Sequence, residues 1–107
     1  MSARRWMISD FPEDARREAG HQLHLVQLGD DPHDWKPMTS VGPGVYEIRI
    51  HTAAEHRVLF VSKHVEGIYV LHAFQKRTRQ TRQPDINLAR ERLKALNEAR
   101  RTAGRRR

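Results

Sequence analysis

The amino-acid sequence predicts a small α+β domain with an N-terminal helix or helical hairpin, an antiparallel β-sheet and a C-terminal helix. Three observations lead to this prediction. An apolar stripe with helical spacing follows residue 10, three segments with strand character succeed one another across short links, and a second helical seam follows residue 84. Because short links join neighbouring strands into an antiparallel meander, we expect one sheet with helices on one of its faces.

The first helix is expected to begin in "DFPED", residues 10–14, where Asp10 or Ser9 can cap it. Pro12 is tolerated in a first helical turn, and Gly29 is expected to end the helix. The apolar stripe of this helix is formed by Phe11, Ala15, Ala19, Leu23 and Val26. Before the helix, Arg5–Ile8 is a candidate for a short strand.

The sheet is expected to follow a loop over residues 29–44, which are rich in Gly, Pro and Asp. Trp35 and Met38 are expected to pin this loop to the core. In "VYEIRIH", residues 45–51, apolar and polar residues alternate, which predicts a strand with one buried face. "RVLFVS", residues 57–62, predicts a more deeply buried strand, and "IYVLHAF", residues 68–74, predicts a third.

The last helix is expected to open at Pro84 and Asp85. Its apolar seam is formed by Ile86, Ala89, Leu93 and Leu96. The end of the chain, "RRTAGRRR", has no apolar pattern. We therefore expect a single domain over residues 1–100 and a basic, frayed tail over residues 101–107.

The composition limits the classes of protein and site. The chain has 107 residues and no cysteine, which excludes disulfides and thiolate metal sites. No apolar run is long enough to cross a membrane, and the first residues do not resemble a signal peptide. We therefore expect a cytoplasmic protein.

The positive charge is concentrated in the last part of the chain. Residues 1–66 carry 8 Lys and Arg against 10 Asp and Glu, whereas residues 67–107 carry 12 against 3. Such asymmetry indicates a polyanionic partner, which can be nucleic acid, an anionic membrane or an acidic protein. Because 16 of the 20 cations are arginine, the composition favours phosphate.

Three predicted strands could direct cations onto one concave surface. Arg49 lies on the polar face of the first strand, Arg57 opens the second, and Lys76 and Arg77 follow the third. Cations held on strands are suited to stabilising charge in a transition state. The alternative is that these residues are solvated or paired with Glu47 and other acidic neighbours.

Histidine offers two further hypotheses. His21 and His24 have a spacing that can bind metal on a helix, but a third ligand is not identifiable, so we expect neither a metal nor a cofactor. His72 is expected on the same strand face as Val70 and Phe74. Its role is either that of a hydrogen-bonded core residue or that of a general base.

Four segments in order, "WKPM", "GVYEIRI", "HRVLFV" and "LHAFQKRT", resemble the RelE/ParE superfamily of type II toxin–antitoxin systems. The phage-derived, HigB-like branch is the most similar, and the resemblance covers roughly residues 6–98. It implies a toxin with the RelE-like fold. RelE- and HigB-type members cut mRNA on the ribosome, and ParE-type members poison DNA gyrase. The alternatives are therefore a gyrase poison or an inactive phage-derived nucleic-acid-binding protein.

By position, the resemblance implies a metal-free endoribonuclease in which Arg49 and Arg57 stabilise the phosphate. Lys76, assisted by Arg77, would bind the phosphate or protonate the leaving oxygen. The general base stays open among His72, His51 and Glu47. The implied partners are mRNA, the ribosome and a cognate antitoxin with a helix-turn-helix. Residues expected to contact RNA diffusely are Arg79, Arg82 and Arg90.

Overall fold

The computed structural model describes residues 10–63, 67–76 and 79–105. Its elements, in chain order, are α2 (Glu13–Gln27), β1 (Trp35–Pro37), β2 (Val45–His51), β3 (Glu55–Lys63), β4 (Gly67–Gln75) and α3 (Gln83–Arg105). The four strands form one antiparallel sheet in the order β1-β2-β3-β4. The predicted α+β fold of helix, antiparallel sheet and C-terminal helix is therefore confirmed. The candidate strand Arg5–Ile8 lies outside the described residues.

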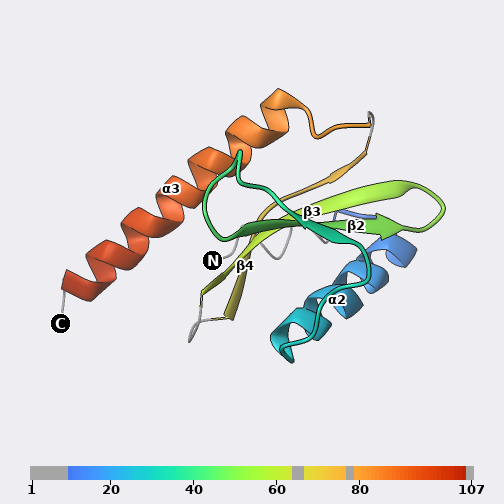
Figure 1. The fold of residues 1–107 in the computed structure, drawn as a ribbon, viewed down its shortest axis with the longest axis horizontal. Coiled ribbons are helices and arrows are strands. Elements are labelled where there is room, and N and C mark those ends of the chain that lie inside the picture. Colours follow the sequence, from blue (N-terminus) through green and yellow to red (C-terminus); the bar gives the residue numbers. More distant parts are fainter. Residues whose placement is uncertain (1–9, 64–66, 77–78, 106–107) are drawn as a thin grey trace.

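The two helices pack on opposite faces of the sheet, so the prediction that helices cover one face is wrong (Figure 1). On the α2 face, the core residues include Ala15, Ala19, Ile48, Ile50, Val58 and Val70. On the α3 face, they include Val45, Leu59, Val61, Leu71, Ala89, Leu93 and Leu96. The strands carry apolar residues at both alternating positions, and such strands need a cover on each side.

Both ends of α2 are fixed by backbone conformation. Pro12 is the N-cap residue and lies before the first turn, and no side chain supplies a capping hydrogen bond. Of the two expected capping residues, Asp10 is therefore not the cap, and Ser9 lies outside the described residues. At the other end Gly29 has a φ of 87°, a left-handed conformation that glycine adopts without strain. The predicted stop is confirmed.

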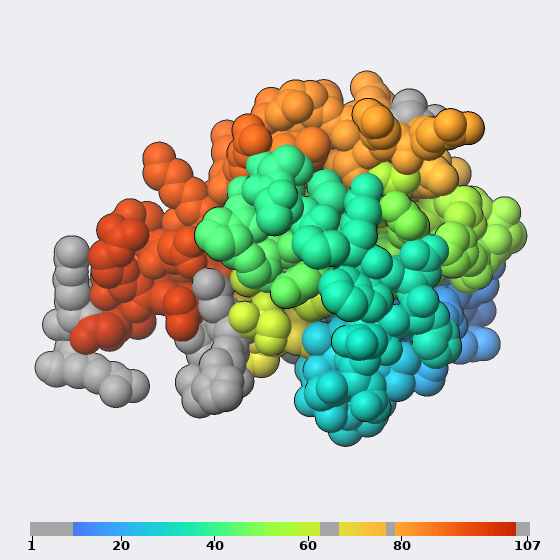
Figure 2. All heavy atoms as spheres, in the orientation of Figure 1, coloured from blue at the N-terminus to red at the C-terminus, as the bar shows by residue number. Residues whose placement is uncertain are grey.

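The segment 29–44 contains the short strand β1, which the sequence did not predict. This strand pairs Trp35 with Ile48 and Pro37 with Tyr46. It lies at the edge of the sheet, where a proline is tolerated because no further strand needs its missing N–H group. Met38 is buried as predicted, whereas Trp35 stays 38% exposed. Figure 2 shows this segment lying across the front of the molecule between α2 and α3.

A β-bulge in β4 changes the faces of its side chains. Leu59 pairs with His72 but Phe60 pairs with Val70, so Leu71 is the extra residue. Leu71 and His72 therefore both face α3, while Val70 faces α2. The prediction that His72 and Val70 lie on the same face is therefore wrong, because the extra residue of a bulge interrupts the alternation of side chains.

α3 continues through Arg105, so the segment expected as a frayed tail is helical as far as that residue. Figure 1 shows its last turns projecting beyond the sheet. Within the described ranges, neither helix combines the length and the apolar character that crossing a membrane requires.

Gly20 inside α2 and Gly29 just beyond its end should respond in opposite ways to substitution by alanine. Gly20 lies inside the helix with open space where a Cβ would stand, so Gly20→Ala should stabilise the fold by about 0.5–1 kcal/mol. Gly29 also has open space but a positive φ, so Gly29→Ala should destabilise by about 1 kcal/mol. Urea unfolding of both variants measures the difference, and an equal effect of the two would contradict this assignment.

Candidate functional site

Three of the predicted cationic residues, Arg49, Arg57 and Lys76, lie at one end of the sheet. Arg49 of β2 is paired in register with Arg57 of β3, which in turn is paired with Phe74 of β4. Lys76 follows β4 directly, and its backbone N–H donates to the carbonyl of Glu55 at 2.8 Å. Three neighbouring strands thus bring these cations to the same end of the sheet.

Arg57 is buried, with 1% of its surface exposed, and it is bound from two elements. Its Nη1 donates to Thr81 Oγ1 and its Nη2 to the carbonyl of Arg79, both at 2.6 Å. The Thr81 hydroxyl in turn donates to Glu47 Oε2 at 2.5 Å. Arg57 Nη1 lies 3.5 Å from the same carboxylate oxygen. The guanidinium therefore ties the segment before α3 to β2 and β3.

Glu47 is completely buried, which corrects its predicted place on an exposed polar face. Its Oε1 forms no hydrogen bond among the described residues but lies 3.7 Å from Arg49 Nε and 3.9 Å from Lys36 Nζ. One carboxylate thus faces three cations and offsets the repulsion between Arg49 and Arg57. Since both carboxylate oxygens face cations or Thr81, this geometry does not favour Glu47 as a general base.

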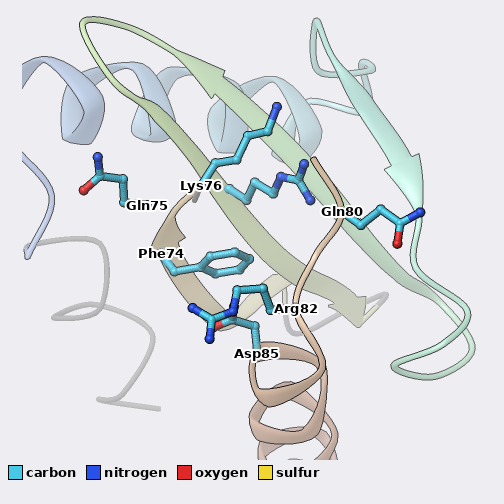
Figure 3. A pocket seen from close by; sticks show the side chains of 7 residues that line it. Phe74, Gln75, Lys76, Gln80, Arg82 and Asp85 are labelled. Carbon is cyan, nitrogen blue, oxygen red and sulfur yellow. The ribbon is translucent and has the colours of Figure 1, made fainter. Parts of the chain in front are cut away.

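A cavity of about 160 Å³ opens beside this network, where β4 ends and α3 begins. Its lining includes three cations, one carboxylate and one aromatic ring: Arg57, Lys76, Arg82, Asp85 and Phe74. Figure 3 shows the Phe74 ring between Lys76 on one side and Arg82 with Asp85 on the other. Gln75 and Gln80 complete the lining. The cavity is therefore suited to an anion with a flat group attached.

His72 lies behind this cavity and faces α3. Its Nε2 is 2.8 Å from Asp85 Oδ1, its Nδ1 is 3.5 Å from Arg92 Nη1, and its ring stacks on Phe74. Burial lowers the pKa of His72 below its usual 6.5; Asp85 opposes this shift and Arg92 adds to it. A neutral ring donates from Nε2 to Asp85, which leaves its acceptor atom facing Arg92. This geometry favours a supporting role for His72 over that of a base.

The remaining predicted residues are divided. Arg82 lines the cavity and the exposed Arg79 flanks it, while Arg77 lies outside the described residues. Arg90 instead donates from Nε to the carbonyl of Ser40 at 2.7 Å, which ties α3 to segment 29–44. Sequence reasoning missed Asp85 as a site residue, because a carboxylate in the first turn of a helix is fully explained by the helix dipole.

A polar cluster adjoins Arg49. His51 contacts Asp34 through Nε2 at 2.6 Å and Glu55 through Nδ1 at 2.5 Å, and Asp34 also pairs with Arg49 at 3.4 Å. The hydrogen bond to Asp34 raises the pKa of His51, and the same contact lowers the pKa of Asp34. With both ring nitrogens committed to carboxylates, His51 does not fit the role of a general base.

In the described part of the chain, no group of three or more His, Asp or Glu side chains has an arrangement that could hold a metal ion. Of the candidate pair on α2, His21 packs its ring against that of His33, with 6.0 Å between the centroids.

The buried ion pair gives a stability prediction. Arg57→Ala should destabilise the fold by about 3–5 kcal/mol, because it leaves the Glu47 carboxylate buried without its partner. The double variant Glu47→Leu with Arg57→Met should recover much of that loss, since neither charge is then buried. Arg49→Ala is the control and should cost less than about 1 kcal/mol, as a half-exposed ion pair does. Urea unfolding decides, and an Arg57→Ala variant as stable as the control contradicts the assignment.

The His51 cluster gives a pH prediction. Because the pKa of His51 is raised, its contribution to stability is complete below pH 6.5 and is lost as the pH rises through the higher value in the folded protein. Because the pKa of Asp34 is lowered, its contribution is present above pH 3.8 and is lost as the pH falls through its folded value. His51→Asn should therefore cost more stability near about pH 5 than near about pH 9. Urea unfolding at both pH values, with His24→Asn as the matched control, tests this; an equal cost at both contradicts it.

The comparisons with known proteins place the chain in a family. The family model described as "Phage derived protein Gp49-like (DUF891)" matches residues 7–94, which include all four strands, α2 and the first half of α3. None of the curated proteins that were compared matches the chain. This family is phage-derived and related to RelE-like toxins. With most of its length matched, the chain belongs to the phage-derived Gp49-like family.

Proposed function

We propose that this protein is the toxin of a type II toxin–antitoxin system, of the HigB-like type, and that it cuts mRNA on the ribosome. The observation that carries the proposal is the cavity between β4 and α3, whose lining combines the cations Arg57, Lys76 and Arg82 with the carboxylate of Asp85. The cations suit a phosphodiester, and the carboxylate suits the proton of a neighbouring hydroxyl. The toxin-related family supports the same conclusion.

The proposed reaction is an attack of the ribose 2′-oxygen on the adjacent phosphorus. The Asp85 carboxylate accepts the 2′-hydroxyl proton as the new P–O bond forms. The P–O5′ bond then breaks, and the Lys76 ammonium protonates the departing 5′-oxygen. The products are a 2′,3′-cyclic phosphate and a 5′-hydroxyl. Arg82 and the edge of the Arg57 guanidinium stabilise the negative charge on the phosphorane.

The residues around the cavity have distinct roles in this proposal. His72 holds Asp85 in place through its 2.8 Å hydrogen bond and stacks on the Phe74 ring. An RNA nucleobase can stack on that ring. Arg57, through Thr81 and the Arg79 carbonyl, holds the segment that carries Arg82. Arg57 therefore acts mainly by positioning, and Lys76 and Asp85 carry the proton transfers.

The partners follow from the charge distribution. The basic residues 67–107 would contact ribosomal and messenger RNA phosphates, with an affinity that falls steeply with salt. An antitoxin, which we expect to carry a helix-turn-helix, would neutralise the toxin and repress the operon. All of these encounters would take place in the cytoplasm.

The test is induction of the gene, followed by primer extension on total RNA with and without a block of translation initiation. Growth should stop, and mRNA should be cut only when it is being translated. Lys76→Ala and Asp85→Asn should each lower cleavage by about 10²–10⁴-fold, as loss of an acid or base does. Arg17→Ala, which removes an exposed cation from α2, is the matched control and should cut normally.

Other results would overturn the proposal in different ways. Intact mRNA with DNA breaks and an SOS response would make the protein a gyrase poison. Normal growth after induction of the folded protein would make it an inactive nucleic-acid-binding protein. If cleavage is unchanged in both the Lys76 and the Asp85 variants, the protein is still an endonuclease, but its active site is not this cavity.

A further inference from the structure

A second cavity of about 160 Å³ lies on the other face of the sheet, beyond the C-terminal end of α2. Its walls combine three aromatic rings, those of Trp35, Tyr46 and Phe60, with two carboxylates, those of Asp30 and Asp31. Neither the proposed reaction nor the toxin-related family accounts for this combination. Two of these aromatic residues, Tyr46 and Phe60, are paired in register and belong to the α2 face of the core.

The rings form a corner and not a flat stack. Trp35 and Tyr46 meet at 71° with their centroids 5.4 Å apart, and Tyr46 and Phe60 lie at 33° and 5.9 Å. A corner of this kind presents ring faces in more than one direction, and the negative faces of aromatic rings attract cations. Trp35 remains 38% exposed, so its ring is accessible from outside the molecule.

The charge around this corner is negative, in contrast to the chain as a whole. Asp30 and Asp31 are exposed, and within the described part of the chain neither carboxylate forms a hydrogen bond or an ion pair. The C-terminal end of the 15-residue helix α2, where the helix dipole is negative, is adjacent through Val26. A positively charged ligand is thus favoured by the aromatic faces, by the two carboxylates and by the end of the helix.

We propose that this cavity binds an arginine side chain presented by a partner protein. Among biological cations, the guanidinium is planar enough to stack on an aromatic face while its N–H groups donate to carboxylates at the rim. RNA is disfavoured because its phosphates would meet Asp30 and Asp31. The site lies on the sheet face opposite the basic cavity and shares none of its lining residues.

The experiment titrates the full chain with N-acetyl-arginine amide and follows ¹H–¹⁵N NMR shifts. The Trp35 indole N–H and the amides of residues 30 and 31 should move in a saturable way below about 50 mM, the range that a millimolar site requires. N-acetyl-citrulline amide has the same shape without the charge and should bind at least about tenfold more weakly. Added salt should weaken only the arginine compound.

Three variants sharpen the test. Asp31→Asn and Trp35→Leu should each weaken binding by about three- to tenfold. Glu91→Gln removes an exposed carboxylate from α3 and should leave binding unchanged. The unchanged spectrum of each free variant outside the cavity verifies that it is folded.

Three results overturn the proposal. The first is the absence of saturable shifts at these resonances, and the second is equal binding of arginine and citrulline. The third is a shift of the same resonances that depends on the concentration of the protein, with neither arginine nor citrulline compound added. It would assign the cavity to a second copy of this chain.

Discussion

The buried contact of Glu47 with Arg57 is the interaction on which the rest of this structure depends. Removing two charges from water is costly, and the cost is offset only where the geometry is good and further polar groups take part. Here Thr81 and the Arg79 carbonyl supply hydrogen bonds, while Arg49 and Lys36 add positive charge around the carboxylate. The group therefore joins the consecutive strands β1, β2 and β3 to the segment before α3, which is distant from them in the chain.

This buried contact explains why, at the basic cavity, the buried guanidinium of Arg57 is not assigned the proposed proton transfers. The residue with the most suitable charge, Arg57, is held from two sides and has little freedom to follow a substrate. Its hydrogen bonds fix the segment that carries Arg82, and the next helical turn brings Asp85 to the same cavity. Lys76, which is partly buried, lines the same cavity. A guanidinium held by hydrogen bonds beside further cations is a preorganised arrangement for anions.

The sequence predicted the elements whose residues repeat locally and missed those set by contacts between distant segments. The helices and β2–β4 followed from apolar spacing, since each needs only its own residues to show its period. β1 is three residues long and contains Pro37, so it has no period to detect. The bulge at Leu71 is produced by pairing with β3. Glu47 looked exposed because alternation marks a polar position but cannot show that Arg57 and Thr81 will cover it.

The short strand β1 also links the two faces of the molecule. Because successive side chains of a strand point to opposite faces, Trp35 forms a wall of the acidic aromatic cavity while Lys36 reaches towards Glu47. The segment is held at its start by Asp34, which pairs with His51 and Arg49, and near its end by the buried Met38. A displacement of β1 would therefore alter the charge around Glu47 and the aromatic corner at the same time. β1 thus lines the acidic aromatic cavity directly and reaches the basic cavity only through Glu47, whereas β3 lines both, with Phe60 in one and Arg57 in the other.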